Sequence, residues 1–175
     1  MKKLTLLFSG ILLIIGGRSL LAQTTIQASA TGHISAEVIT SFSATETSQM
    51  SFGRFSPGPF GGLIILTPQG IVSVMGSVVK GSGMQNAASF YVSGDNNTSF
   101  SINLPTTPAT LTSTSGAKTM LVSNWVSIPS QSPGTAALRD GFLAVYVGAT
   151  LEVGTMTDNP VGTYTGSYTI TFDFN

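Results

Sequence analysis

The sequence predicts an all-β protein, a sandwich of short strands, on three observations. Apolar and polar residues alternate with period two through most of the chain, which is typical of strands that bury one face. Clusters of Gly, Pro, Asn, Asp and Ser divide this pattern into roughly eight to ten short segments. After the first 22 residues, no window shows the spacing of an amphipathic helix.

Residues 1–22 have the layout of a secretory signal peptide. Lys2 and Lys3 precede an apolar run from Leu4 to Ile15, and polar residues follow the leader. The apolar run is too short to span a bilayer, which takes about 20 apolar residues. We therefore expect cleavage near Ala22, export of the chain, and no stable membrane insertion afterwards.

The composition excludes several classes of function. Charged residues make up 8% of the 175-residue chain, against a usual share of about 25%. Cleavage would remove three of the seven basic residues and none of the seven acidic ones, so the mature chain would carry a net charge of −3. Such a chain offers no basic surface for nucleic acid. The absence of cysteine excludes disulfides, thiol catalysis and an anchor on a lipidated cysteine.

We expect an N-terminal strand segment over residues 23–49 and one β-sandwich domain over residues 50–175. The first strand places small residues between two bulky ones on its apolar face. That face consists of Ile26, Ala28, Ala30, Gly32 and Ile34, followed by Ala36 and Val38. Because an open sheet edge accepts a further strand, residues 24–38 suit a strand donated to a neighbouring molecule. The alternative is an ordinary first strand in the chain's own sheet.

The C-terminal segment alternates as clearly as the first strand. One face consists of Gly162, Tyr164, Gly166, Tyr168, Ile170, Phe172 and Phe174. With a glycine fourteen residues from the end and an aromatic residue in the penultimate position, the segment resembles the C-terminal pattern by which periplasmic chaperones bind chaperone–usher pilins. The penultimate residue of that pattern is usually tyrosine, and here it is Phe174. We expect this strand to line a groove that accepts a donated strand, or to be bound by a chaperone.

Short apolar segments and turns fill the middle of the chain. The expected strands are Leu63–Leu66, Ile71–Met75, Ser89–Val92, Phe100–Leu104, Met120–Val126, Phe142–Val147 and Leu151–Val153. Pro68-Gln69-Gly70 forms a turn, and residues 94–97 form the tip of a hairpin. Gly148 interrupts the last two strands, and segments 53–62 and 129–136 are loops.

No constellation of residues indicates an enzyme. His33 is the only histidine, it lies on the polar face of the first strand, and there is no G-x-S-x-G elbow. Residues 95–97 and the pair Asp158-Asn159 carry oxygen atoms of the kind that calcium binds. Each is too short to form a calcium site alone, and turn chemistry explains both. We expect no catalytic residue, metal or cofactor.

Aromatic residues have two interpretations. Trp125, Tyr91 and Tyr146 could build a sugar-binding platform, but each lies in an apolar strand, which favours positions in the core. The expected core consists of Phe52, Ile65, Val74, Phe90, Val92, Phe100, Ile102, Trp125, Leu143, Val145, Leu151, Tyr168, Ile170 and Phe172.

An ordered set of motifs covers roughly residues 50–175. The motifs are Ser51-Phe52-Gly53-Arg54-Phe55, Gly61-Gly62, Pro68-Gln69-Gly70, residues 88–94 (ASFYVSG), residues 147–154 (VGATLEVG) and residues 162–171 (GTYTGSYTIT). In these motifs the chain resembles the bacterial family called domain of unknown function 4402, which is similar to spore-coat-U-like and common-pilus-type fimbrial proteins. The resemblance implies an immunoglobulin-like sandwich with Greek-key connections, exported by a Gram-negative bacterium to the periplasm, the cell surface or the medium. It transfers no catalytic residues.

Together these features favour a pilin-like structural or adhesive surface subunit, assembled by donor-strand exchange. Its expected partners are copies of itself, other pilus subunits and a periplasmic chaperone. The alternative is a self-complete secreted module that recognises glycan or a surface protein through its loops, at residues 53–62, 94–98 and 129–140.

Overall fold

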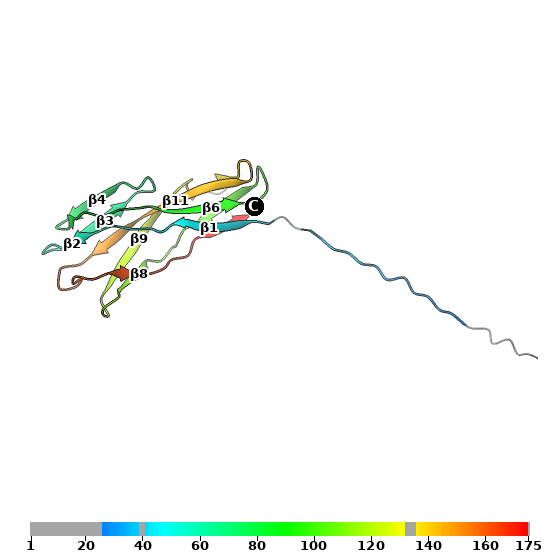
Figure 1. The fold of residues 1–175 in the computed structure, drawn as a ribbon, viewed down its shortest axis with the longest axis horizontal. Coiled ribbons are helices and arrows are strands. Elements are labelled where there is room, and N and C mark those ends of the chain that lie inside the picture. The colour runs from blue at the N-terminus through cyan, green and yellow to red at the C-terminus, as the bar shows by residue number, and fades with distance from the viewer. Residues whose placement is uncertain (1–25, 39–40, 132–135, 175) are drawn as a thin grey trace, which may run out of the picture. The chain divides into compact units, whose positions relative to one another are not determined.

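The structure is a computed structural model that describes residues 26–38, 41–131 and 136–174. Its contacts divide the chain into an N-terminal unit and a compact unit that begins at Val38. The described residues of the first unit, 26–37, form neither helix nor strand (Figure 1). All of them are exposed. The predicted signal peptide over residues 1–22 lies outside the described residues.

The described part of the compact unit contains strands and no helix, which confirms the all-β prediction. The strands are β1 (Ser43–Ser48), β2 (Phe55–Ser56), β3 (Gly62–Leu66), β4 (Val72–Gly76), β5 (Val79–Lys80), β6 (Ala88–Ser93), β7 (Ser99–Asn103), β8 (Ala109–Ser113), β9 (Thr119–Ile128), β10 (Ala136–Ala137), β11 (Phe142–Val153), β12 (Tyr164–Thr165) and β13 (Thr171–Phe174). Every pair of these strands is antiparallel.

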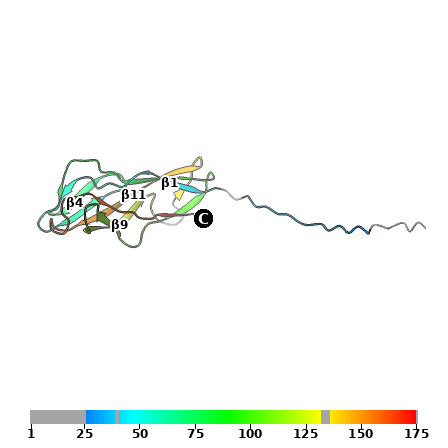
Figure 2. The same cartoon turned by 60° about the horizontal axis from the view of Figure 1, so that its bottom comes forward.

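The largest sheet has eight strands and curls. Its path runs β1-β6-β11-β9-β8-β12, so β1 and β12 are the edge strands at the two ends of this path, and β4, which pairs with β3 alone, is a further edge. The long strand β11 pairs with β6 through residues 142–147 and with β3 through residues 149–153, and β3 also pairs with β4. The hairpin β3-β4 lies at the end of the compact unit opposite the C-terminal end of β13 (Figure 2).

A three-stranded sheet, β10-β7-β13, forms the second layer. Nine buried residues from β6, β7, β10, β11 and their connections form one core cluster between the two sheets: Ala88, Val92, Phe100, Ile102, Leu104, Ala136, Leu138, Val145 and Val147. A second cluster consists of residues on β3, β9 and β11 of the eight-stranded sheet together with Val78, which lies between β4 and β5: Ile64, Val78, Met120, Val122, Ala149, Leu151 and Val153. The Greek-key connections of an immunoglobulin-like sandwich stay a prediction.

Gly148 lies within a single strand, β11, where we expected two strands separated by this glycine. A Cβ atom there would lie 2.2 Å from the backbone oxygen of Leu66, so no larger residue fits without moving the backbone. β11 therefore continues through Gly148 from Phe142 to Val153, because glycine allows the close approach of a neighbouring chain.

The hairpin predicted around residues 94–97 is wrong. β6 pairs with β1 and β11 in the large sheet, whereas β7 pairs with β10 and β13 in the small one. The expected turn chemistry is nevertheless present: Asn97 has a φ of 62°, and Asn96 Oδ1 accepts hydrogen bonds from the N–H groups of Asn97 and Asp140, each at 2.9 Å. The turn thus connects two sheets. In contrast, the turn expected at Pro68-Gln69-Gly70 does join the paired strands β3 and β4.

The core prediction is confirmed at its centre and wrong at some strand positions. Val92, Phe100, Ile102, Val145 and Leu151 are fully buried. Phe52, Phe90, Trp125, Leu143, Tyr168, Ile170 and Phe172 are half-buried and pack against the two clusters, and Ile65 is half-buried. Val74 is 38% exposed because β4 pairs with β3 alone. Tyr91 and Tyr146 are exposed as well, since their neighbours Val92, Val145 and Val147 take the inward positions.

The folded sheet begins earlier than the expected domain. β1 lies within the range 23–49 that we assigned to the N-terminal strand segment, and it pairs with β6 from Ser43 to Ser48. Phe42, just before β1, packs its ring against Phe100 with centroids 5.6 Å apart.

Candidate functional site

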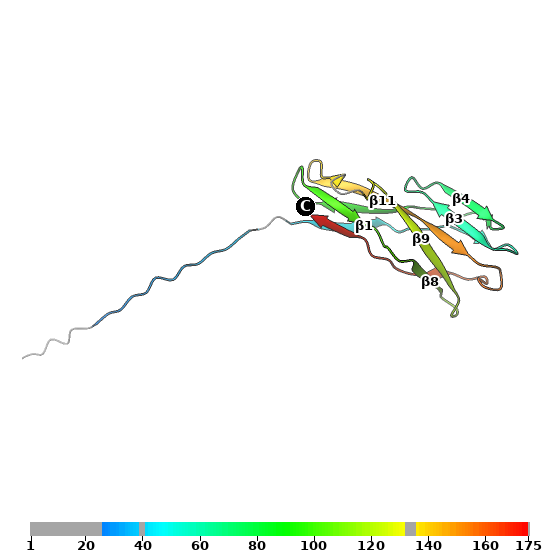
Figure 3. The ribbon, with the colours of Figure 1, turned by 180° about the vertical axis from the view of Figure 1, so that it is seen from behind.

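The edge strands β1 and β12 of the eight-stranded sheet lie on opposite sides of a groove. One wall consists of Glu46 and residues 49–57, which follow β1, and the other consists of residues 159–168, which contain β12. The volume between them is about 970 Å³. In Figure 3 the C-terminal segment runs from the side of β8 toward β1. Edges that face each other across a groove leave backbone positions where a further strand could pair.

The floor of the groove is apolar. It is formed by Phe90, Ala109, Leu111, Met120, Val122, Trp125 and Leu151, which come from β6, β8, β9 and β11. Several of these side chains belong to the second core cluster or pack against it, so the groove opens onto the core itself. An apolar floor in contact with the core gains stability when an apolar partner covers it.

A bulge in β9 places the side chain of Trp125 on this floor. Between the pairs Gly148–Val126 and Thr150–Ser123, β11 advances by two residues and β9 by three. The extra residue lies next to Asn124, whose φ of 52° is in the left-handed region that asparagine tolerates. Before the bulge Met120 and Val122 face inward, and after it the inward face passes to Trp125 and Ser127. Bulges reorient side chains in this way.

Trp125 and Tyr168 meet across the floor. Their ring centroids are 4.6 Å apart. Trp125 Nε1 and the Tyr168 hydroxyl are buried without a hydrogen-bond partner among the described residues. Burial raises the pKa of the Tyr168 phenol above its usual range, and the negative charge of Glu46 adds to the rise. The aromatic pair therefore stays neutral at any physiological pH.

The C-terminal wall is a chain segment that leaves the eight-stranded sheet at β12 and joins the three-stranded sheet at β13. β12 pairs with β8 and β13 pairs with β7, whereas residues 166–170 between them belong to no ladder. Gly166 passes close to β8, where a Cβ atom would lie 2.3 Å from the backbone oxygen of Thr110. Among the described residues, no strand pairs with the backbone of residues 166–170.

The structure divides the predicted C-terminal residues into three groups. Gly162, Tyr164 and Tyr168 line the groove. Ile170 and Phe172 pack against the first core cluster instead, and Phe172 contacts the rings of Phe90 and Phe100. Phe174 is 56% exposed, with its ring centroid 6.1 Å from that of Phe42.

The residues predicted for strand donation are all exposed. Ile26 and Ile34 are 94% and 99% exposed, and Ala28, Ala30 and Gly32 are exposed between them. No described residue pairs with this segment, and its donation to a neighbouring molecule stays a prediction. A strand requires a neighbouring strand that pairs with its backbone N–H and C=O groups, and this segment has none among the described residues.

The wall formed by residues 49–57 was predicted only in part. Phe52 was assigned to the core, and segment 53–62 to a loop that carries recognition only in the alternative of a binding module; the segment contains β2. The available signal was the spacing of Met50 and Phe52, two apolar residues that continue the period-two pattern after β1.

A turn held by hydrogen bonds contributes Met156 and Asn159 to the lining of the groove. Asp158 Oδ2 accepts bonds from Thr155 Oγ1 at 2.7 Å and from Thr155 N at 3.1 Å. These two bonds hold the pKa of Asp158 below its usual value. The Asp158-Asn159 pair, considered above as calcium ligands, is thus engaged within the turn. Among the described residues, no group of three or more His, Asp or Glu side chains could hold a metal ion.

We expect Asn159→Ala to lower the free energy of unfolding by about 2 kcal/mol or more. Asn159 is 3% exposed. Its Oδ1 accepts a bond from Gly154 N at 2.6 Å, and its Nδ2 donates to Thr119 O at 2.8 Å. Removal of the amide leaves two partly buried backbone groups, Gly154 N–H and Thr119 C=O, without this partner, at about 1–3 kcal/mol each. Urea unfolding measures the loss. The exposed Asn103→Ala is the control, and equal losses in the two variants would contradict the role of Asn159.

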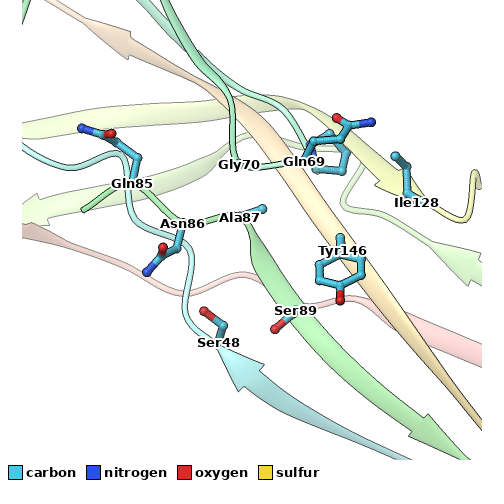
Figure 4. Close-up of a pocket in the computed structure, with 10 residues that line it drawn as sticks. Ser48, Gln69, Gly70, Gln85, Asn86, Ala87, Ser89, Ile128 and Tyr146 are labelled. Carbon is cyan, nitrogen blue, oxygen red and sulfur yellow. The ribbon is translucent and has the colours of Figure 1, made fainter. Parts of the chain in front are cut away.

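A second, smaller hollow lies on the outer side of the large sheet (Figure 4). Its volume is about 610 Å³. The residues drawn in Figure 4 come from the ends of β1 and β9, from β6 and the segment just before it, from the β3-β4 turn and from β11. They are Ser48, Pro68, Gln69, Gly70, Gln85, Asn86, Ala87, Ser89, Ile128 and Tyr146. None of these residues carries a charge, and none lines the groove.

A search of the described residues finds no helix with the length and apolar character needed to cross a membrane. Comparison with curated proteins and with solved structures gives no match. A comparison with family models matches the domain of unknown function DUF4402 over residues 42–174, from the residue before β1 to the end of β13. This match covers most of the chain and nearly all of its compact unit, and the chain therefore belongs to the DUF4402 family.

Proposed function

We propose that the protein is an exported, pilin-like structural or adhesive surface subunit, which assembles when residues 24–38 of one copy enter the groove of the next. One observation carries the proposal. The two edges of one curled sheet face each other across an apolar groove, while the same chain holds an alternating segment that is exposed and unpaired. This proposal includes export to the periplasm or cell surface, a relation to fimbrial subunits, an immunoglobulin-like topology and the absence of enzymatic activity.

The hydrophobic effect supplies the driving force. Ile26 and Ile34 are almost fully exposed in the structure, and burial of an isoleucine side chain contributes about 1.5–3 kcal/mol. The small side chains between them suit the middle of the groove, where the large rings of Trp125 and Tyr168 already occupy the floor. The inserted strand would also pair with the backbone of residues 166–170.

The sheet topology limits how one strand can enter. Five antiparallel pairings separate β1 from β12, so these edges run in opposite directions. A single strand between them must be antiparallel to one edge and parallel to the other. We propose that it is antiparallel to residues 164–170. Antiparallel pairing is the more stable form, and the register of β1 is broken between Glu46 and Ser48.

This polarity distinguishes a neighbouring molecule from the chain itself. A segment that folds back through the short connection before β1 would form a hairpin, and a hairpin is antiparallel to β1. It would therefore be parallel to the C-terminal segment. A strand antiparallel to residues 164–170 comes from a second copy.

Disulfide trapping tests both the insertion and its polarity. The chain has no cysteine, so each introduced pair is unique. Donor variants Ser29→Cys and Ser35→Cys are mixed separately with acceptor variants in which cysteine replaces one of the exposed residues Thr163, Thr165, Ser167 and Thr169. The expected result is that Ser29→Cys forms covalent dimers best with positions near 169 and Ser35→Cys with positions near 163, on non-reducing gels.

The other outcomes separate the parts of the proposal. The opposite preference would contradict the antiparallel arrangement while keeping strand insertion. Cross-links within one chain, found when both cysteines are in the same molecule, would replace assembly by fold-back. If no pair cross-links in any combination, strand insertion is wrong, and the self-complete binding module becomes the better explanation.

A further inference from the structure

We propose that the hollow beside Tyr146 binds a neutral saccharide. The hollow combines one exposed aromatic ring, side-chain amides and hydroxyl groups, with no charge among its lining residues. A site for a small ligand is concave and mainly apolar, with a few placed polar groups, and has a volume of about 300–1,000 Å³. The volume of about 610 Å³ lies within that range.

Tyr146 supplies the aromatic surface. The alternation of β11 buries Val145 and Val147 and turns Tyr146 outward, where it is 45% exposed. Its neighbours across the strands are Ile128 on β9 and Ser89 on β6. No ring of another described residue stacks on Tyr146, whereas Tyr91, on the same side of the sheet, already stacks on Phe142 with an interplanar angle of 17°. An exposed ring of this kind accepts the apolar C–H face of a pyranose.

Two amides supply hydrogen bonds at the edge of the hollow. The side chains of Gln69 and Asn86 line it and have no hydrogen bond among the described residues. The backbone that carries Asn86 is fixed by two bonds with Ser51, at 2.8 and 2.9 Å. A turn bond from Gly70 N to Thr67 O, at 2.9 Å, fixes the position of Gln69. Each amide carries both donors and an acceptor, as do sugar hydroxyl groups.

The lack of charge determines the class of ligand. Phosphates and other anions are bound by Arg, Lys or clustered backbone N–H groups, and no Arg or Lys lines the hollow. A cation would need carboxylate oxygens, and no Asp or Glu lines it either. Neutral hydroxyl groups match the amides and serine hydroxyls that are present. Because the hollow shares no lining residue with the groove, this proposal is independent of strand insertion.

Isothermal titration of the mature chain with cellobiose, maltose, chitobiose and α-1,2-mannobiose tests the proposal. We expect at least one of these disaccharides to bind with a dissociation constant below about 10 mM. Tyr146→Ala should weaken this binding about tenfold or more, and Asn86→Ala should weaken it as well. The matched control is Tyr91→Ala, which removes an equally exposed tyrosine outside the hollow and should leave binding unchanged.

Three results would overturn the proposal. The first is no heat of binding for any of the four disaccharides at about 10 mM. The second is binding that Tyr146→Ala leaves unchanged, or that Tyr91→Ala weakens equally. The third is tighter binding of an anionic sugar such as glucuronic acid than of every neutral one. All three variants alter exposed or half-buried side chains, and an unchanged melting temperature confirms that each variant is folded.

Discussion

A peptide of residues 24–38 should raise the melting temperature of the domain that begins at Val38 by about 10 °C. At one hundred times its dissociation constant, a ligand of the folded state adds about 2.7 kcal/mol of stability. For a domain of this size, each kcal/mol shifts the melting temperature by roughly 3–5 °C. Calorimetry measures the shift. Fluorescence gives a second readout, since Trp125 is the only tryptophan and lies on the floor of the groove.

Peptide variants provide the control for this experiment. Ala30→Lys places a charge on the face that would be buried, so it should remove most of the shift. Thr31→Lys places the same charge on the outward face and should preserve it. A shift that is equal for the two variant peptides, or absent for the original one, would show that residues 24–38 do not enter the groove.

Ile34→Asp in the mature chain should abolish assembly without destabilising the subunit. Ile34 is 99% exposed and has no described contact, so the folded unit loses nothing. In an inserted strand the same position would be buried, and an unpaired carboxylate there costs several kcal/mol. Light scattering reports the polymers and circular dichroism the melting temperature of the subunit.

The matched variant is Ser35→Asp, which adds the same charge one residue further on, where the strand would face solvent. It should assemble as the original chain does. If Ile34→Asp assembles normally, or if the two variants fail alike, the apolar face of residues 26–34 is not what joins the copies.

Period-two alternation was sufficient to predict the class of the fold. It also predicts the buried positions of β7 and of residues 142–147 in β11, because each residue of a regular strand faces one side only. From Val147 to Leu151 every residue of β11 is buried, and alternation no longer describes the strand. The alternation no longer predicts which residues face inward where a β-bulge inserts one extra residue into a strand. The bulge at Asn124 moves the inward face of β9 by one residue, and nothing local distinguishes Trp125 in a core from Trp125 on the floor of a groove.

Pairing between strands was less predictable than their existence. Residues 94–97 have the composition of a hairpin tip and form a turn, yet β6 and β7 belong to different sheets. The choice depends on side chains distant in sequence, such as Phe100 packing with Phe42 and Phe172. Tyr91 and Tyr146 were misplaced for a related reason. An aromatic residue in an apolar strand indicates burial only when the strand has cover on both faces.

The candidate groove could be predicted only in part. Its C-terminal wall was inferred from the alternation of residues 162–174, whereas the opposite wall, residues 49–57, has too few apolar residues to indicate a site. A groove is a property of two edges that meet in space. The sequence of either edge alone does not specify its partner.

In the described part of each copy, the groove and the exposed segment of residues 26–38 are different surfaces. Contacts between unlike surfaces are head-to-tail, and they produce open filaments unless the rotation between copies closes a ring. A filament of this kind has two chemically distinct ends, one with an empty groove and the other with an unpaired strand. Its growth is therefore directional, and a single chain that lacks residues 24–38 but keeps its groove would terminate it at one end only.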